Sequence, residues 1–429
     1  MKNKETIYIV ACVIILIVMA GGAYWYFLMG PAAAPQPSTT TGTSTGFQPL
    51  GRTPGQATGT TSGTTTSSTG TTTTSVLATL RLLSTTPVGG YGASTTARTT
   101  IVRWVDRGRG NVYEASYDSS AILTVSNTVV PKIYESAWNR NLTAFVGSIF
   151  STDNLSWTAV YSQLVPQSST TVPTAVNNPS GQTALAPFAL RGKRLPDQMI
   201  TYAISPKKDR LFMLVNENGS GVGYVSTIDG SNVTRIFTTP LTQVHAEWPT
   251  DNSIAITTNG SAGYTGFLYF VSPKTGVWTK ILGPLLGLST VSSHDGKYVL
   301  YSYSTNAGAV ATNILSIAQT TSMDAGVRTL ADKCAWGNNY TTVVYCAVPS
   351  QMPSGTYPDD WYKGTISTVD KVWQIDAPTG NTTLVSSLID HADRSIDAFN
   401  LGLEATDGHL FFMNKNDLSL WSLDITKTR

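Results

Sequence analysis

Residues 288–302 read LSTVSSHDGKYVLYS, and this stretch decides the fold because two short apolar strands flank one polar turn. The same pattern recurs as ITYAISPKKDRLFMLV at 200–215, VHAEWPTDNSIAITT at 244–258 and DKCAWGNNYTTVVYC at 332–346. The first turn residues lie 44 positions apart, and they are Ser205, Pro249, Ser293 and Gly337. A fixed period of this length predicts a chain built from repeated supersecondary units.

Each unit continues with a third strand and often a fourth, and polar turns such as 229–232 and 272–276 join them. Four antiparallel strands in about 44 residues form one blade of a β-propeller. Further copies at 134–146 and 401–414, and an earlier unit over 89–125, bring the count to seven. The sequence therefore predicts an all-β, seven-bladed propeller. Six or eight blades stay as alternatives, because residues 140–200 can be divided in more than one way.

The two ends of the repeat region complement each other. The last unit has three strands before the chain ends, whereas the strand ATLRLL at 78–83 precedes the first unit without a sheet of its own. We expect residues 78–83 to supply the outer strand of the last blade and so to close the ring, which removes exposed strand edges. The propeller is thereby expected over residues 76–429.

The turns SPKKD at 205–209 and SHDGK at 293–297 resemble the SPDGK turn of TolB-like propeller repeats, a family related to WD-repeat-like propellers. The resemblance covers about residues 78–426, although other copies such as WPTDN at 248–252 depart from the motif. It implies a propeller similar to periplasmic binding platforms or to the propeller halves of some peptidases. Because that family is functionally mixed, the fold alone does not choose among these activities.

Composition excludes one class of partner. Only 13% of the 429 residues are charged, and beyond residue 76 the chain carries 25 basic and 25 acidic side chains. A nucleic-acid-binding domain needs a basic face that replaces condensed counterions. We therefore expect no nucleic-acid partner.

An uncharged apolar segment begins at Ile7 and ends at Met29, and the charges near it are Lys2, Lys4 and Glu5. Its length matches a membrane-spanning helix, and the basic end is expected to stay in the cytoplasm. Residues 1–30 are thus predicted to form a short cytoplasmic tail and a signal-anchor in the cell membrane. The alternative is a cleaved signal peptide, with the alanines at 32–34 as its cleavage site.

Residues 31–75 are almost entirely Thr, Ser, Gly, Pro, Ala and Gln. Such a segment buries too little apolar surface to offset its chain entropy, so we expect a disordered linker. The propeller would then lie on the extracytoplasmic side, at the end of a flexible stalk.

Cys334 and Cys346 fall on the first and second strands of one repeat, whereas Cys12 lies in the membrane segment. Outside the membrane we expect a disulfide between the two repeat cysteines, and two free thiols are the alternative. No further Cys or His stands near them to complete a zinc site.

The repeat region over residues 76–429 lacks a Gly-x-Ser-x-Gly elbow, and the four histidines of the chain are scattered. His245 with Glu247 on an inner strand, and His391 in an acidic loop, are the residue types that serve as bases or ligands. These groups are too far apart in the sequence to indicate a catalytic or metal-binding constellation, so no catalytic residue, metal site or cofactor is predicted.

Two insertions interrupt the repeat, one over about 165–195 and the other over about 348–368. Long loops on a rigid scaffold are where binding residues usually lie. The candidate binding residues are Tyr357, Asp359, Asp360, Trp361, Tyr362, His391 and Asp393. They would suit a basic peptide, a sugar or a cation, and a loop packed on itself is the alternative. If the first insertion falls between blades, both insertions decorate one face.

These features favour a membrane-anchored, extracytoplasmic propeller that binds or scaffolds a protein or glycan of the cell envelope. Two alternatives stay open. One is an extracytoplasmic hydrolase or lyase that uses the propeller funnel. The other is a structural assembly subunit of the cell surface.

Overall fold

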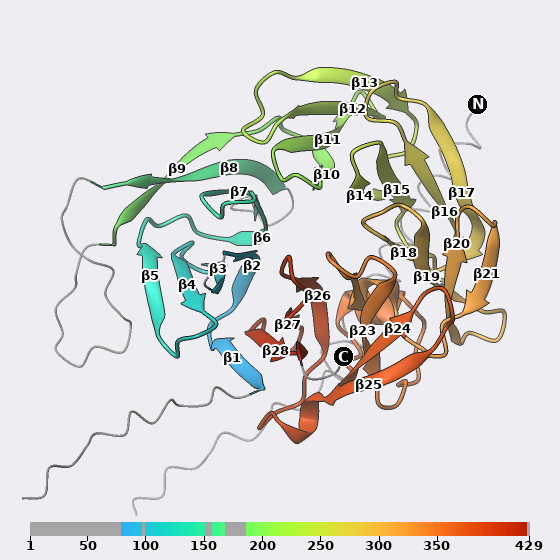
Figure 1. The fold of residues 1–429 in the computed structure, drawn as a ribbon. Coiled ribbons are helices and arrows are strands. Elements are labelled where there is room, and N and C mark those ends of the chain that lie inside the picture. Colours follow the sequence, from blue (N-terminus) through green and yellow to red (C-terminus); the bar gives the residue numbers. More distant parts are fainter. Residues whose placement is uncertain (1–78, 97–98, 151–156, 168–185, 427–429) are drawn as a thin grey trace, which may run out of the picture. The chain divides into compact units, whose positions relative to one another are not determined.

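The computed structural model describes residues 79–96, 99–150, 157–167 and 186–426 (Figure 1). The chain divides into two compact parts, and all of the described residues belong to the second part, Thr73–Arg429. This part is all-β: it contains 28 strands, and its helices are single short turns. The predicted membrane segment and linker lie outside the described residues. Within the described ranges, no helix has both the length and the apolar character needed to span a bilayer.

Four sheets are built from four consecutive strands in sequence order. The first contains β10 (Met199–Ile204), β11 (Arg210–Glu217), β12 (Ser220–Thr227) and β13 (Thr234–Thr239). The second contains β14 (Val244–Thr250), β15 (Ser253–Thr258), β16 (Thr265–Val271) and β17 (Trp278–Leu286). The third contains β18 (Ser289–Ser292), β19 (Tyr298–Ser304), β20 (Val310–Ser316) and β21 (Thr321–Asp324). The fourth contains β22 (Cys334–Trp336), β23 (Val343–Pro349), β24 (Asp370–Asp376) and β25 (Thr382–Ser387).

An eight-stranded sheet precedes them in the chain. Its strands are β2 (Val88–Thr95), β3 (Thr100–Asp106), β4 (Val112–Ser116), β5 (Ile122–Ser126), β6 (Ile133–Trp138), β7 (Ala144–Phe150), β8 (Trp157–Pro166) and β9 (Phe188–Arg194). They form two antiparallel four-stranded units, β2–β5 and β6–β9, which a single parallel bridge between Ser126 and Phe188 connects. The sheet therefore contains two copies of the same unit.

The remaining sheet joins the two ends of the repeat region. It has the order β1 (Leu80–Ser84), β28 (Leu420–Asp424), β27 (His409–Asn414) and β26 (Ala398–Leu403). β1 is antiparallel to β28, with Leu80 opposite Leu423, and Asp424 N–H donates to the carbonyl of Thr79 at 2.8 Å. The first of the described strands thus completes the sheet that the last three described strands begin.

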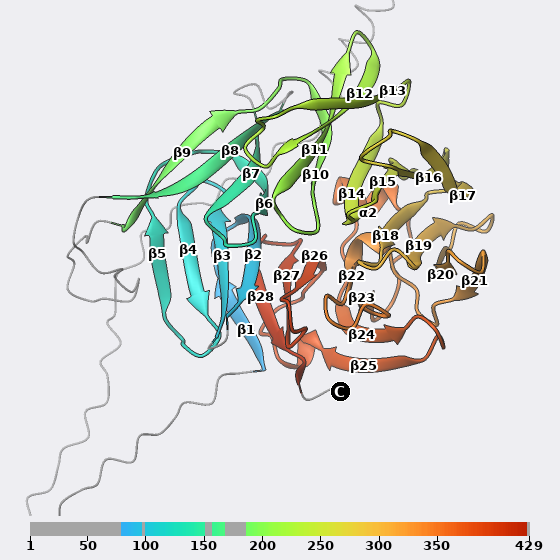
Figure 2. The ribbon, with the colours of Figure 1, turned by 45° about the horizontal axis from the view of Figure 1, so that its top comes forward.

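The units are arranged around a common centre, with the first strand of each unit on the inside and the fourth on the outside (Figures 1 and 2). The apolar core lies between neighbouring units. One cluster packs Phe212 of β11 against Ile256 of β15, and another packs Leu83 of β1 against Val88 of β2 and Trp104 of β3. Large apolar side chains on both faces of each sheet therefore hold the units to one another.

Loops on the two faces of this arrangement differ in origin. The hairpins between the first and second strands of successive units touch one another, as the ion pair of Lys207 with Asp251 at 2.8 Å shows. Asp295 and Thr341 make a second such contact at 3.2 Å. We call this side the turn face. The connections between second and third strands, and those between units, lie on the opposite side, which we call the insertion face.

The two insertions do not share a face. The second insertion joins β23 to β24 and lies on the insertion face. The first joins β8 to β9, the third and fourth strands of one unit, and so begins and ends on the turn face. Its residues 168–185 lie outside the described residues.

Candidate functional site

The second insertion contains the short helix α2 (Asp359–Lys363). Tyr357 and Trp361 are both 4% exposed and pack with Val310 and Leu330 in one apolar cluster. Burial of two aromatic rings removes a large apolar area from water, which fixes the insertion on the sheet beneath it. Two of the candidate binding residues are thus part of the core of the insertion.

Hydrogen bonds connect the insertion to two neighbouring units. The Asp359 carboxylate accepts hydrogen bonds from Ser261 Oγ at 2.8 Å and from the backbone N–H of Ala262 at 2.7 Å. Ser304 Oγ donates to the carbonyl of Tyr357. Since Ser261 follows β15 and Ser304 ends β19, residues 357–363 fasten three successive sheets together. We call this segment the strap.

A buried ionic cluster lies under the strap. Lys333 is 1% exposed, and its Nζ contacts Asp370 Oδ2 at 2.8 Å, Thr368 Oγ1 at 2.9 Å and a carboxylate oxygen of Asp397. Trp361 Nε1 donates to both oxygens of Asp397 at 3.2 and 3.1 Å. Burial raises the pKa of Asp370, whereas at Asp397 the charge of Lys333 and several hydrogen bonds outweigh burial and lower the pKa.

This buried ionic cluster has a structural role and is not a ligand site. Its carboxylates are saturated with donors from the protein, so they offer no acceptor to a ligand. Removing one partner of such a buried pair costs about 3–5 kcal/mol, because the remaining charge stays buried and unpaired.

The two remaining candidates in the insertion, Asp360 and Tyr362, differ in how far their side chains are exposed. Asp360 accepts the N–H of Thr356 at 2.7 Å, within the insertion itself. Tyr362 is 43% exposed, and its hydroxyl donates to Asp332 Oδ2 at 3.0 Å. The enclosing protein raises the pKa of Tyr362 well above its ordinary value. Of the five candidates in the insertion, Tyr362 alone is exposed.

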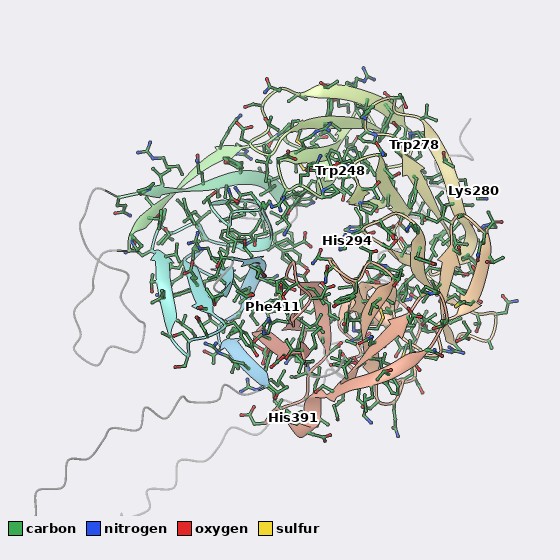
Figure 3. All side chains as sticks on the ribbon, viewed as in Figure 1. Trp248, Trp278, Lys280, His294, His391 and Phe411 are labelled. Atoms are coloured by element: carbon green, nitrogen blue, oxygen red, sulfur yellow. A yellow bond between two sulfur atoms is a disulfide. The ribbon has the colours of Figure 1, made fainter. Side chains whose placement is uncertain are left out.

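His391 and Asp393 do not join the strap. His391 follows the 3-10 turn η2 (Leu388–Asp390), near the outer margin of the ring (Figure 3). Asp393 Oδ1 pairs with Arg394 Nε at 3.1 Å, and Arg394 also reaches Asp417 at 3.3 Å. Within the described residues, no hydrogen bond or ion pair links His391 or Asp393 to residues 357–362. The structure therefore divides the predicted set between two places.

Glu247 occupies the inner strand β14, and its Oε2 accepts the backbone N–H of Ser292 on β18 at 3.2 Å. Burial raises its pKa to about 7, the charge of His245 opposes that rise, and the charge of Asp332 adds to it. Some of its surface stays accessible, so the group is enclosed by protein without being sealed from water. Glu247 is thus a carboxyl group that changes its charge near neutral pH.

Two cationic side chains and one imidazole come from the hairpins of the turn face: Arg140, Lys208 and His294. All three side chains reach solvent. The surrounding turns still remove part of the water around Lys208 and His294, and this desolvation lowers the pKa of both groups. Arg140 lowers the pKa of Lys208 further, and Lys208 does the same to His294. His294 lies on the inner side of the ring (Figure 3). We call these three residues the collar.

Asp407 is the acidic residue beside the collar, and its carboxylate is hydrogen-bonded within the protein. Asp407 is fully buried, and its carboxylate accepts backbone N–H groups of Asn338 at 2.8 Å and of Asn339 and Tyr340 at 2.9 Å. Its charge raises the pKa of His294, opposing the effects of burial and of Lys208. Asp407 is thus hydrogen-bonded to the hairpin between β22 and β23 and acts on His294 through its charge.

A groove of about 610 Å³ opens on the same face, between the sheets β10–β13 and β14–β17. Its lining includes the cations Arg210, Arg235 and Lys274 and, among the described residues that form it, no carboxylate. Arg210 also lies over the ring of Trp248, 5.2 Å from the ring centre. The turn face therefore carries two groups of basic residues, one central and one in the groove.

Sequence reasoning did not single out the collar, although a signal for it exists. Arg140 and His294 each follow the first residue of the repeated turn, Asn139 and Ser293, so they hold the same position in two units. Lys208 lies three residues after Ser205. Superposing the repeats on a ring would bring these positions to one centre.

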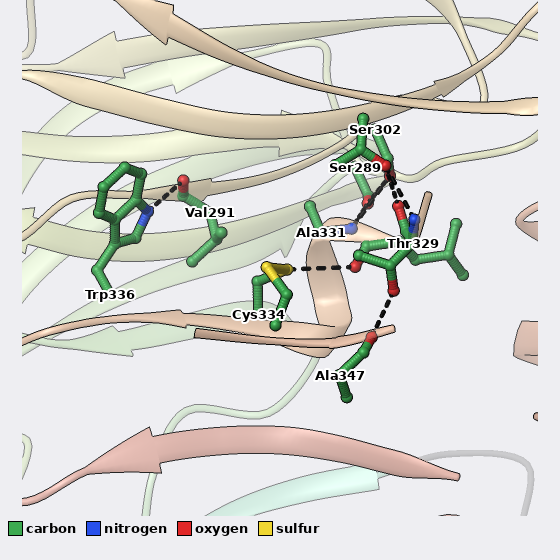
Figure 4. Close-up of a disulfide and its surroundings, with 11 residues drawn as sticks. Ser289, Val291, Ser302, Thr329, Ala331, Cys334, Trp336 and Ala347 are labelled. Carbon is green, nitrogen blue, oxygen red and sulfur yellow. Dashed lines mark hydrogen bonds between the residues drawn. A yellow bond between two sulfur atoms is a disulfide. The ribbon is translucent and has the colours of Figure 1, made fainter. Parts of the chain in front are cut away.

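The cysteine pair faces across β22 and β23, where Cys334 and Cys346 are register partners, and their sulfurs are bonded (Figure 4). Hydrogen bonds to the neighbouring sheet surround the pair: Trp336 Nε1 donates to the carbonyl of Val291 at 3.0 Å, and Ala331 N–H donates to Ser289 Oγ at 3.2 Å. The disulfide thus links two strands of one sheet, on the side that packs against the neighbouring sheet. In the part of the chain that the structure describes, no three His, Cys, Asp or Glu side chains are grouped as metal ligands.

No protein-family profile matches this chain, and no curated protein matches it. Similar solved structures include TolB from Acinetobacter baumannii, 12% identical with a TM-score of 0.38, over 74% of this chain and 60% of that one. A puromycin-hydrolyzing peptidase from Mycobacterium tuberculosis is 13% identical with a TM-score of 0.41, over 75% of this chain and 50% of that one. The chain thus spans between half and two thirds of these proteins, and neither likeness assigns it an activity.

Proposed function

We propose that residues 79–426 form a seven-bladed β-propeller that acts as a non-catalytic binding module for a protein of the cell envelope. Seven four-stranded units support the blade count, since the eight-stranded sheet contains two of them. An apolar cluster fills each seam between neighbouring units, including the seam between β22–β25 and β26–β28. The ring is thus continuous.

The observation that carries the binding role is the contrast between the two faces of a rigid ring. The strap fastens the insertion face through Asp359 and Trp361, whereas the turn face presents cations without ion-pair partners among the described residues. A rigid scaffold that holds exposed, unpaired charges in fixed places is suited to recognition.

We extend this proposal to the location of the module. The apolar segment from Ile7 to Met29 would anchor it in the cell membrane with the N-terminus in the cytoplasm, and residues 31–75 would hold the propeller away from the bilayer on the extracytoplasmic side. A protease added to intact cells should then remove residues 79–426 and leave the first residues protected. Full protection of the propeller would contradict this topology.

Photo-crosslinking in cells tests the binding role. A crosslinking amino acid would replace Tyr340 on the turn face, Tyr264 on the insertion face, or Leu384 on the outer strand β25, which are 46%, 77% and 45% exposed. We expect one protein to be captured from Tyr340 and not from Leu384. Equal labelling from all three positions would contradict a specific binding face, and crosslinks between copies of this chain would favour an assembly subunit.

A second candidate function, hydrolysis or elimination at the centre of the ring, has one observation in its favour. Glu247 has a pKa of about 7 beside His245, as a general acid or base at neutral pH requires. Turnover of any substrate that Glu247→Gln abolishes while binding persists would establish this alternative.

A further inference from the structure

We propose that the turn face binds an extended, carboxylate-rich polypeptide segment, which the collar Arg140, Lys208 and His294 holds at the centre and the groove lined by Arg210, Arg235 and Lys274 holds further out. This inference rests on the proposed binding role and names the chemistry of the partner. It also reverses the ligand expected from the sequence, because the acidic residues of the insertion are committed to internal contacts.

The collar places two permanent positive charges and a histidine close together, and Asp407 and Asp295 act on the histidine. Its residues come from three units, and the structure shows no ion pair for Arg140 or Lys208 among the described residues. Arg140 lowers the pKa of Lys208, and Lys208 lowers the pKa of His294, so positive charge at one position disfavours positive charge at the next. An anion placed among them removes that repulsion and gains charge-assisted hydrogen bonds.

Lys208 is held in an unfavourable backbone conformation. Its φ is 57°, a left-handed value that the equivalent turn at 293–297 assigns to Gly296, with φ 70°. A lysine there costs about 1 kcal/mol relative to glycine. The turn therefore accepts glycine at this position, which makes Lys208→Gly a variant that removes the charge and keeps the backbone.

The groove determines the shape of the ligand. Its volume of about 610 Å³ exceeds what one small anion fills, and its cations come from two units, Arg210 and Arg235 from one and Lys274 from the next. Cations distributed over a face match carboxylates distributed along a chain. The balanced charge of residues beyond 76 is too low for the larger polyanion of a nucleic acid.

His294 is expected to make the affinity for the peptide depend on pH. Burial and Lys208 lower its pKa, whereas Asp407 and Asp295 and a hydrogen bond to the backbone of Trp336 raise it. A bound carboxylate favours the imidazolium and raises that pKa, so binding takes up a proton. Affinity is therefore expected to increase as the pH falls, and His294→Gln should remove most of this increase.

The test uses the full chain and a fluorescent deca-glutamate peptide, with fluorescence anisotropy as the readout. Lys208→Gly removes the charge and relieves the backbone, so the variant stays folded, and we expect it to weaken binding about tenfold. Lys207→Met is the matched control: this neighbouring lysine is paired with Asp251 at 2.8 Å, and its loss should change affinity less than about twofold. Arg235→Gln combined with Lys274→Met tests the groove in the same way.

Three outcomes would overturn the inference. One is equal binding by the Lys208→Gly and Lys207→Met variants. Another is competition by inorganic phosphate at the same concentration as the peptide, which would indicate a small-anion site only. The third is binding to vesicles with anionic lipids and not to the peptide. If crosslinks from Tyr340 persist while the peptide fails to bind, the binding role stands and the acidic ligand is wrong.

Discussion

Glu247 shows how one inner-strand position sets a dependence on pH. Its pKa is about 7 in the folded protein against 4.5 for the ordinary group, so the folded state holds a proton that the unfolded chain has released in this interval. Stability is therefore expected to fall as the pH rises from about 4.5 to about 7. The sign follows from burial, which penalises the charged form.

We predict that Glu247→Gln removes this loss. Glutamine stays neutral and still offers an oxygen to the N–H of Ser292. The variant should match the wild type at pH 4.5 and exceed its free energy of unfolding by about 1–3 kcal/mol at pH 8, as urea denaturation would measure. Curves that stay parallel across this range would show that Glu247 is ionised at little cost, with His245 compensating.

Single residues were the hardest features to place from the sequence. The types of residue at 357–362 suggested a binding loop, but Asp359 bonds to Ser261 and Ala262, almost 100 positions away. Partners so distant in the chain leave no local pattern. The collar has a weak pattern, because Arg140 and His294 share a repeat position, yet only the ring brings them together.

The strap is the element that departs most from the repeat. The strands of the 44-residue repeat are predictable because each is a short run rich in apolar residues between polar turns, and that signal is local. The strap has no such signal: its form depends on Ser261 and Ser304 in other units. The strands were therefore predictable from the sequence, whereas the course of the insertion was not.

We predict that Asp359→Ala loosens the strap from β15 and β16. The change removes two hydrogen bonds to a carboxylate and should cost about 2 kcal/mol. Hydrogen exchange should accelerate at residues 261–264 and 357–364, while the sheets keep their protection. Asp393→Ala is the control, since it removes only an exposed pair with Arg394 and should leave exchange in both segments unchanged. Unchanged exchange in both segments would show that Tyr357 and Trp361 hold the strap alone.

The closed ring makes the stability of one seam a property of the whole protein. β1 and β28 complete the last sheet, and their side chains join clusters on both sides of it. In an open array of repeats, a terminal unit can fray while the others stay folded. In a ring each unit has two neighbours, so opening any seam removes packing from two units at once.

We predict that Leu80→Ala destabilises the protein by about 2–4 kcal/mol, and that it still unfolds in one transition. Leu80 is 6% exposed and packs with Leu410, Trp421 and Leu423. Leu384→Ala is the matched control, because Leu384 is 45% exposed on the outer strand β25 and should lose less than about 0.5 kcal/mol. Calorimetry would distinguish this from separate melting of β26–β28, which would contradict cooperative closure.

The pairing of β1 with β28 also fixes an order of events during synthesis. β1 leaves the ribosome first among the described strands, and its partner follows roughly 340 residues later, which takes about 20–70 s at ordinary rates of translation. Throughout that time β1 has no strand to pair with, and the growing ring keeps two open edges. β1 is only five residues long and carries Arg81, features that discourage pairing with a wrong strand. Synthesis of β28, the last of the described strands, therefore decides when the ring loses its open edges and becomes less prone to aggregation.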